Sequence, residues 1–236
     1  MSRRQHIAVV AILVAVISTV LVAVFLNVSL FPTPASTQAG PIDRMLRIMF
    51  AIGGVILALC LVVLIYSAIA FRHRPGDAEE GPPVEGNPPL ELVWTLVPLA
   101  IVLWLAFEGT IALRDISRAS PEVELEVQVT ASQWAWRFDY PQYGITTTEL
   151  RLPVDRPVLF RLTSEDVIHS FWVPEWRVKQ DAVPGMEQVL RVTPTRMGSY
   201  KAWCAELCGL AHSLMQAPVK VVEPAAFETW VKEPGK

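Results

Sequence analysis

Three long apolar segments fill most of the first half of the chain and constrain its fold more than any other feature. They are residues 7–31 (25 residues), 48–71 (24 residues) and 92–113 (22 residues), and only the last contains an acidic or basic residue, Glu108. Each exceeds the roughly 20 apolar residues that an α-helix needs to cross the hydrocarbon core of a bilayer. Open strands and irregular loops would leave backbone groups unpaired in lipid. We therefore predict three transmembrane helices.

The first segment has the positive start of a cleavable signal peptide. Its apolar stretch, however, is about twice the 7–15 residues of a typical signal-peptide core, so we expect a retained helix. Basic residues mark the ends that would lie inside the cell, and they are Arg3, Arg4, Arg72, His73 and Arg74. The positive-inside rule then places the N-terminus and the 72–90 connector in the cytoplasm and everything after Arg114 outside. We expect a bacterial plasma membrane.

The composition agrees with a chain that is part membrane protein and part aqueous domain. Hydrophobic residues make up 52% and charged residues 18%, which is too apolar for a wholly soluble protein and too polar for one that lies entirely in lipid. The net charge of −3 provides no basic field, so we expect no nucleic-acid partner. We predict a first helix with an external loop (1–44), a helical hairpin (45–114) and an external domain (115–236).

The pattern of the external domain is that of β-structure. Residues 122–129 alternate polar and apolar side chains with a period of two, which is typical of a half-buried strand. Further strand-like runs, divided by Pro and Gly, cover residues 134–140, 157–163, 188–193, 199–203 and 217–222. Six or more short strands without a helical stretch predict an all-β sandwich or small barrel.

A group of metal-binding residue types lies late in this domain. It consists of Cys204, Cys208, His212 and Met215. Thiolate and thioether ligands favour reduced copper, and imidazole suits copper in both oxidation states. Zinc would take four ligands and has little use for a thioether, and a Cys204–Cys208 disulfide is chemically allowed in an external domain. Neither alternative accounts for Met215. The spacing also differs from the Cys-x-x-Cys-His motif of covalent haem attachment.

A second imidazole is available at His169, beside the end of a predicted strand, although a lone His in an apolar strand is more often a core residue. With these residues the chain resembles cytochrome c oxidase subunit II along nearly its whole length. The family's ligand pattern, H…C-x-E-x-C-x3-H-x2-M, is matched by His169, Cys204, Glu206, Cys208, His212 and Met215. The resemblance implies a cupredoxin-like Greek-key sandwich or barrel for the external domain.

The resemblance also implies a ligand set. In the family, two thiolates bridge the two copper ions of the CuA centre. His169 and Met215 would complete one set, with His212 and the backbone carbonyl of Glu206 among the other ligands. The Glu206 carboxylate would reach a magnesium ion at the contact with subunit I. The alternative for this carboxylate is an ordinary solvated loop acid.

Residues 133–140 are similar to the aromatic segment of the family, in which Trp134 would receive electrons from cytochrome c. The alternative is that Trp134 and Trp136 share one strand face and pack in the core. By the same resemblance, Asp139, Glu165 and Asp166 would attract a basic cytochrome, since acidic charge raises the encounter rate with a cationic partner. An ordinary solvated acidic face is the alternative for each of them.

Glu91 precedes the third apolar segment, where the resemblance would place it at the inner mouth of a proton-uptake path. A carboxylate at a helix end also lies there at little cost, because it can reach water. The resemblance as a whole predicts the electron-accepting subunit of a haem–copper oxidase, which reduces oxygen and pumps protons. Its expected partners are haem-containing subunit I, subunit III, membrane lipid, and cytochrome c or another cytochrome donor.

Three other functions stay open at this point. A membrane-tethered mononuclear cupredoxin would need only one cysteine, so Cys208 argues against it. A quinol oxidase subunit II shares the architecture but lacks copper, and the complete donor set disfavours it. A helical hairpin that only shields subunit I would leave the donor-rich loop unexplained.

Overall fold

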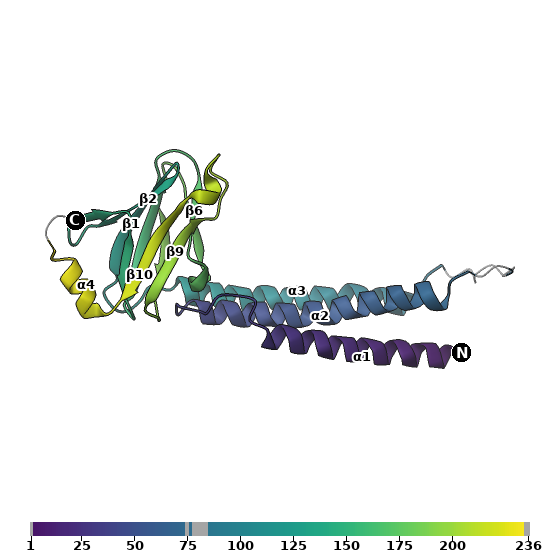
Figure 1. Ribbon diagram of the computed structural model, residues 1–236. Helices are drawn as coiled ribbons and strands as arrows, with labels where there is room; N and C mark the ends of the chain where they lie inside the picture. The colour runs from purple at the N-terminus through teal and green to yellow at the C-terminus, as the bar shows by residue number, and fades with distance from the viewer. Residues whose placement is uncertain (1, 74–75, 77–84, 234–236) are drawn as a thin grey trace. The chain divides into compact units, whose positions relative to one another are not determined.

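The computed structural model describes residues 2–73, 76 and 85–233. Backbone contacts divide the chain into two compact units. One comprises Met1–Leu30 and Arg44–Thr110 and is helical. The other comprises Phe31–Asp43 and Ile111–Lys236 and contains the β-strands (Figure 1). The division at residues 44 and 114 that we drew from the sequence stays a prediction about folding units.

Three helices of the described chain are long and apolar enough to cross a membrane, as predicted. They are α1 (Arg3–Asn27), α2 (Ala39–Ala70) and α3 (Pro88–Ser117). Each extends past its apolar segment on at least one side, because polar residues cap the ends. Ser2 and Gln5 form a capping box at α1, in which each side chain accepts a hydrogen bond from the other residue's N–H. Of the predicted 72–90 connector, residues 74–75, Arg74 included, and 77–84 lie outside the described residues.

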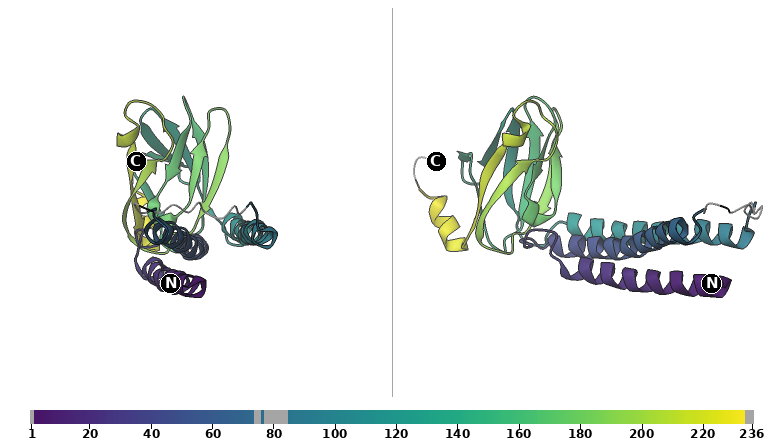
Figure 2. Two further views of the ribbon diagram at one scale, coloured as in Figure 1. Left: turned by 90° about the vertical axis from the view of Figure 1, so that its right-hand side faces the viewer. Right: turned by 45° about the vertical axis from the view of Figure 1, so that its right-hand side comes forward.

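The β-unit is a sandwich of two five-stranded sheets (Figure 2). The first sheet has the order β3-β2-β1-β5-β8 and the second β4-β10-β9-β6-β7. The strands are β1 (Leu125–Ser132), β2 (Ala135–Tyr140), β3 (Ile145–Thr147), β4 (Leu150–Pro153), β5 (Val158–Ser164), β6 (His169–Trp172), β7 (Lys179–Ala182), β8 (Gln188–Val192), β9 (Gly198–Cys204) and β10 (Gln216–Val222). The predicted sandwich is confirmed.

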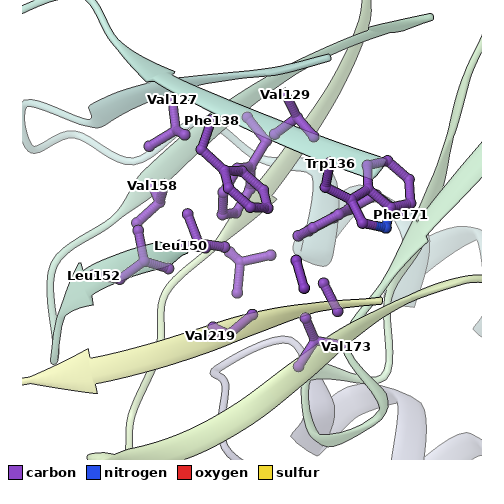
Figure 3. Close-up of a cluster of buried hydrophobic side chains, with 14 of the residues drawn as sticks. Val127, Val129, Trp136, Phe138, Leu150, Leu152, Val158, Phe171, Val173 and Val219 are labelled. Atoms are coloured by element: carbon purple, nitrogen blue, oxygen red, sulfur yellow. The ribbon is translucent and has the colours of Figure 1, made fainter. Parts of the chain in front are cut away.

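The core lies between the two sheets. The alternation of β1 turns Leu125, Val127 and Val129 inward, where all three are fully buried. Side chains from both sheets meet them, as Figure 3 shows for the aromatic centre of the cluster. There the rings of Trp136 and Phe171 pack edge to face, with centroids 5.5 Å apart. The Trp136 ring of this cluster also contacts the ring of His169, which the sequence predicts as a metal ligand.

Two sequence expectations about this domain are incomplete. The described residues include four strands that the sequence reading missed, β3, β4, β6 and β7, each of three or four residues. The expectation of no helical stretch is wrong, because α4 (Pro224–Trp230) follows β10. It buries Phe227 and Trp230 against Tyr140 of β2. Seven residues give too short an apolar pattern to be recognised as a helix.

Within the β-unit, Arg177 binds the segment Phe31–Asp43. Its guanidinium pairs with Asp43 at 2.7 Å, with side-chain exposures of only 6% and 12%. It also donates to the carbonyls of Pro32 and Pro174 and lies over the ring of Phe31. The buried charge is thus paired and hydrogen-bonded, which is what its burial requires.

Candidate metal centre

The predicted metal ligands lie where β6, β9 and β10 meet at one end of the second sheet (Figure 1). Cys204 ends β9 and Met215 directly precedes β10, and the Cys204 N–H donates to the Met215 carbonyl at 3.1 Å. The Ala205 N–H donates to the carbonyl of Ser170 in β6 at 2.9 Å. These two bonds close loop 205–215 against the start of β6, where His169 lies. Strand pairing thereby joins donors that are distant in sequence.

All the predicted ligand atoms converge in this loop. Each is a nitrogen, sulfur or oxygen atom that can bind a metal ion. The Sγ atoms of Cys204 and Cys208 are 3.7 Å apart. Cys204 Sγ lies 3.8 Å from His169 Nδ1 and 3.2 Å from the Glu206 carbonyl oxygen. Cys208 Sγ lies 3.5 Å from His212 Nδ1 and 3.8 Å from Met215 Sδ, which is itself 3.2 Å from His169 Nδ1.

The geometry excludes the disulfide alternative for this structure. The two sulfur atoms are 3.7 Å apart, whereas a disulfide bond is about 2.05 Å long, and both cysteines are free thiols. Donor atoms of His169, Cys204 and Cys208 all lie within 4.8 Å of one another. A thioether and a second imidazole join them, which exceeds the four ligands of tetrahedral zinc. The donor chemistry fits copper, which accepts thiolate, thioether and imidazole together.

Most of the cluster is shielded from water, and its surroundings disfavour the thiolate form of Cys208 in the absence of metal. His169, Cys204, Cys208 and Met215 are buried. Burial, followed by the hydrogen bond to Cys204, raises the pKa of the Cys208 thiol to about 11. Because copper binds the thiolate, loading the site must release the Cys208 proton, and metal affinity will increase with pH.

Asp166 fixes the orientation of the His169 ring. Its Oδ1 lies 2.8 Å from His169 Nε2, which assigns the ring proton to Nε2 and leaves Nδ1 free to bind metal. The same carboxylate accepts the N–H groups of Gln133 and Val167, each at 2.6 Å. Burial raises the pKa of Asp166, but the hydrogen bonds from His169 and the two N–H groups outweigh it and lower the pKa to about 2.

Trp134 lies over the donor loop. It precedes β2, is 39% exposed, and its indole N–H donates to the carbonyl of Cys208 at 3.3 Å. Trp136 is only 2% exposed and packs against His169, with ring centroids 6.1 Å apart. The alternative that both tryptophans share one buried face is therefore wrong. Only Trp136 belongs to the core.

The three predicted docking acids have different surroundings. Asp139 and Glu165 both bind Arg137, at 3.4 Å and 2.9 Å, on an exposed surface. Asp166 instead directs both carboxylate oxygens at partners within the domain, as described above. Partial neutralisation by Arg137 weakens the field that the exposed acids present to a cationic partner.

The remaining predicted residues occupy separate places. Glu206 is exposed, and only its backbone carbonyl contacts the cluster. Glu91 lies in the first turn of α3, where its carboxylate accepts the N–H of Asn87 at 3.0 Å. The Asn87 side chain in turn accepts the N–H of Leu90 at 3.3 Å. Glu91 therefore caps its own helix in this structure.

Sequence reasoning missed two residues at the site, Gln133 and Gly209. The Gln133 side chain donates to the Cys208 carbonyl at 2.7 Å. Gly209 has a backbone φ of +120° in the turn after Cys208. The glycine directly after a ligand cysteine was a visible signal of a special backbone conformation. Nothing local to Gln133 pointed to a partner 75 residues away.

The fold and the donor cluster define a membrane-anchored β-sandwich protein with one buried thiol, imidazole and thioether site. The family model for the transmembrane domain of cytochrome c oxidase subunit II matches residues 23–110, and the model for its periplasmic domain matches residues 145–222. The chain therefore belongs to the cytochrome c oxidase subunit II family. It is a membrane-protein subunit of a haem–copper oxidase, with an external β-sandwich domain, as predicted.

The chain is similar to subunits of both cytochrome c oxidases and quinol oxidases. The cytochrome c oxidase subunit 2 of Thermostichus vulcanus is 35% identical, over 86% of this chain and 78% of the relative. The quinol oxidase subunit 2 of Bacillus cereus is 31% identical, over 78% of this chain and 65% of the relative. The crystal structure of the periplasmic domain of subunit II (CoxB) of Bradyrhizobium japonicum is 30% identical and covers 48% of this chain and 95% of that domain, with a TM-score of 0.45.

Proposed function

We propose that this chain is the electron-accepting subunit of its oxidase. It takes single electrons from cytochrome c, or from another cytochrome, at a centre of two copper ions. It passes them to haem in subunit I, where oxygen reduction is coupled to proton pumping. The observation that carries the proposal is the convergence of two unlinked thiols with two imidazoles, a thioether and a carbonyl in one cluster, whose two thiols, thioether and His169 imidazole are buried.

The arrangement of the donors supports two ions rather than one. The thiols of Cys204 and Cys208 are adjacent, so both thiolates are available to both ions. His169 and Met215 would hold one ion, since their donor atoms lie 3.2 Å apart. His212 and the Glu206 carbonyl would hold the other. When bound, the copper pair supplies a one-electron acceptor whose charge is spread over two nuclei.

The surrounding chain keeps this acceptor rigid. The hydrogen bonds of Cys204 and Ala205 close the loop, and Asp166 holds the His169 ring. The donor set therefore moves little when one electron arrives or leaves, which favours fast transfer. Trp134 is the proposed point of electron uptake, because it is exposed to a docking protein on one side and bonded to the Cys208 carbonyl on the other.

Several assignments extend this proposal by resemblance. Asp139 and Glu165 would attract the cytochrome, the Glu206 carboxylate would hold a magnesium ion at subunit I, and Glu91 would stand at the inner mouth of a proton path. Subunit III is a further expected partner.

A mononuclear cupredoxin carrier is the alternative function, and it leaves the second thiol without a role. A copper-free quinol oxidase subunit leaves the whole donor set without one.

Replacement of Cys208 by Ser in the assembled oxidase tests the proposal. We expect loss of the absorption and electron paramagnetic resonance (EPR) signals of an electron shared by two copper nuclei, and loss of turnover with cytochrome c. Cys60→Ser is the matched control, because Cys60 is a free thiol in α2. It should leave both measurements unchanged. Wild-type turnover in Cys208→Ser would refute the proposal.

A further inference from the structure

One carbonyl connects the exposed tryptophan to the donor loop. The Cys208 carbonyl accepts both the side-chain amide of Gln133, at 2.7 Å, and the indole N–H of Trp134, at 3.3 Å. Cys208 is also a proposed metal ligand. The indole is thereby joined to a ligand residue through a single hydrogen bond and the covalent chain of that residue.

The turn at Gly209 leaves room for this contact. A Cβ atom at position 209 would lie 2.9 Å from Gln133 Nε2, 3.3 Å from Trp134 Cζ2 and 3.4 Å from Trp134 Nε1. The first distance is shorter than real contacts of a Cβ atom, and the other two are tight. Any side chain at 209 would therefore displace the amide, the indole or both.

Core packing does not hold Trp134 in place. Gln133 and Trp134 are both exposed and lie outside the buried hydrophobic cluster. The Gln133 backbone is fixed separately, because its N–H donates to Asp166 at 2.6 Å. With the backbone fixed, the side-chain bond from Gln133 to Cys208 is the shorter of the two bonds that hold the indole segment on the loop.

We propose that Gln133 and Gly209 are positioning residues for electron uptake: Gln133 fastens the Trp134 segment to the Cys208 carbonyl, and Gly209 provides the space. This inference rests on the proposed function of Trp134. In the step concerned, one electron would leave a ferrous cytochrome, which becomes ferric, and would reduce by one electron the copper centre that His169, Cys204, Cys208, His212 and Met215 would hold. No bond forms or breaks, and no proton is transferred.

The test compares matched variants in the assembled, copper-loaded oxidase. Gln133→Leu removes the amide donor, and Gly209→Ala fills the space. Gly144→Ala is the control for backbone strain, because Gly144 also has a positive φ, +64°, but has no atom within 4 Å of the position of a Cβ. Electron uptake is followed after photoreduction of bound cytochrome c at saturating concentration. EPR and absorption spectra report the copper centre separately.

We expect Gln133→Leu and Gly209→Ala to slow electron uptake by up to about fivefold, because loss of one ordinary hydrogen bond lowers the equilibrium constant between the held and the released indole by about that factor. Their copper spectra, and the uptake rate of Gly144→Ala, should match those of the wild type. In a Trp134→Phe background, Gln133→Leu should cause no further slowing, because it acts through the indole.

Other results overturn the inference in distinguishable ways. Wild-type uptake in Gln133→Leu, with slow uptake in Trp134→Phe, would remove the positioning role and leave the proposed function intact. Altered copper spectra in Gln133→Leu would show that the residue acts on the metal centre instead. Equal slowing in Gly144→Ala and Gly209→Ala would assign the effect to backbone strain. Wild-type uptake in Trp134→Phe would refute the role of Trp134, and this inference would fall with it.

Discussion

Replacement of Asp166 by Asn separates a role in positioning His169 from a role in docking a cytochrome. In the structure, Oδ1 accepts from His169 Nε2 and the Val167 N–H, and Oδ2 accepts from the Gln133 N–H. Asparagine offers one acceptor oxygen and one NH2 donor in the same shape. Whichever way the amide turns, its NH2 faces at least one N–H group, so at least one hydrogen bond is lost.

The magnitude follows from the charge of the acceptor. A hydrogen bond to a charged group contributes about 1.5–3 kcal/mol, which corresponds to about 10- to 100-fold in an equilibrium constant. The same range is typical when the hydrogen-bond partner of a metal-bound histidine is removed. We therefore expect Asp166→Asn to lower copper affinity about 10- to 100-fold, measured by competition with a copper chelator of known affinity.

Glu165→Gln is the control, because the adjacent Glu165 is exposed and pairs only with Arg137 among the ion pairs of the described residues. It should leave copper affinity unchanged and weaken cytochrome binding at low ionic strength. If Asp166→Asn leaves copper affinity unchanged and weakens only cytochrome binding, the positioning role is refuted and the docking role is supported.

Three further predictions concern stability and the metal centre. Asp43→Asn should lower the free energy of unfolding, measured by thermal unfolding, by about 3 kcal/mol, because it leaves the buried Arg177 charge without its partner. The control is Glu228→Gln, which removes an exposed ion pair and should lower the same free energy by less than about 1 kcal/mol. Burial raises the pKa of Glu149, but the hydrogen bonds and charges of Lys220 and Arg151 outweigh burial and lower this pKa from its ordinary value. The ionised Glu149 carboxylate therefore stabilises the folded state fully above the pKa of the unfolded state, and this contribution is lost as the pH falls through the pKa of the folded state. Glu149→Gln should make the free energy of unfolding fall less steeply with decreasing pH, as measured by denaturant titrations at several pH values. Met215→Leu should cost less than about 1.5 kcal/mol, because volume is conserved, yet should change the EPR spectrum of the copper-loaded protein; an unchanged spectrum would exclude Met215 as a ligand.

The sequence predicted the elements whose signals are long or strictly periodic. The three apolar segments predicted the helices, because a bilayer requires a minimum length, and the alternation of residues 122–129 predicted β1. The strands that were missed are short. In β6 the burial pattern does not alternate, since His169, Ser170 and Phe171 are all buried. In β7 the residues are mostly polar, and only backbone pairing with β6 identifies the strand.

The residues of the candidate metal centre also divide into those that a local sequence pattern predicted and those that only the tertiary structure shows. Cys204, Cys208, His212 and Met215 lie within one loop, so their spacing alone indicated a shared centre. His169 was inferred from a resemblance, and only strand pairing brings it to the loop. The contacts of Asp166 and Gln133 depend on the tertiary structure, and no local pattern encodes them. For that reason Asp166 was predicted as a docking acid, although its carboxylate faces His169.

The number of copper ions per folded chain tests the central claim most directly. Native mass spectrometry of the copper-loaded protein, compared with its Cys208→Ser variant, gives this number without reference to turnover. The account predicts two copper ions per wild-type chain. A single copper ion, or none, in a fully loaded wild-type preparation would contradict it.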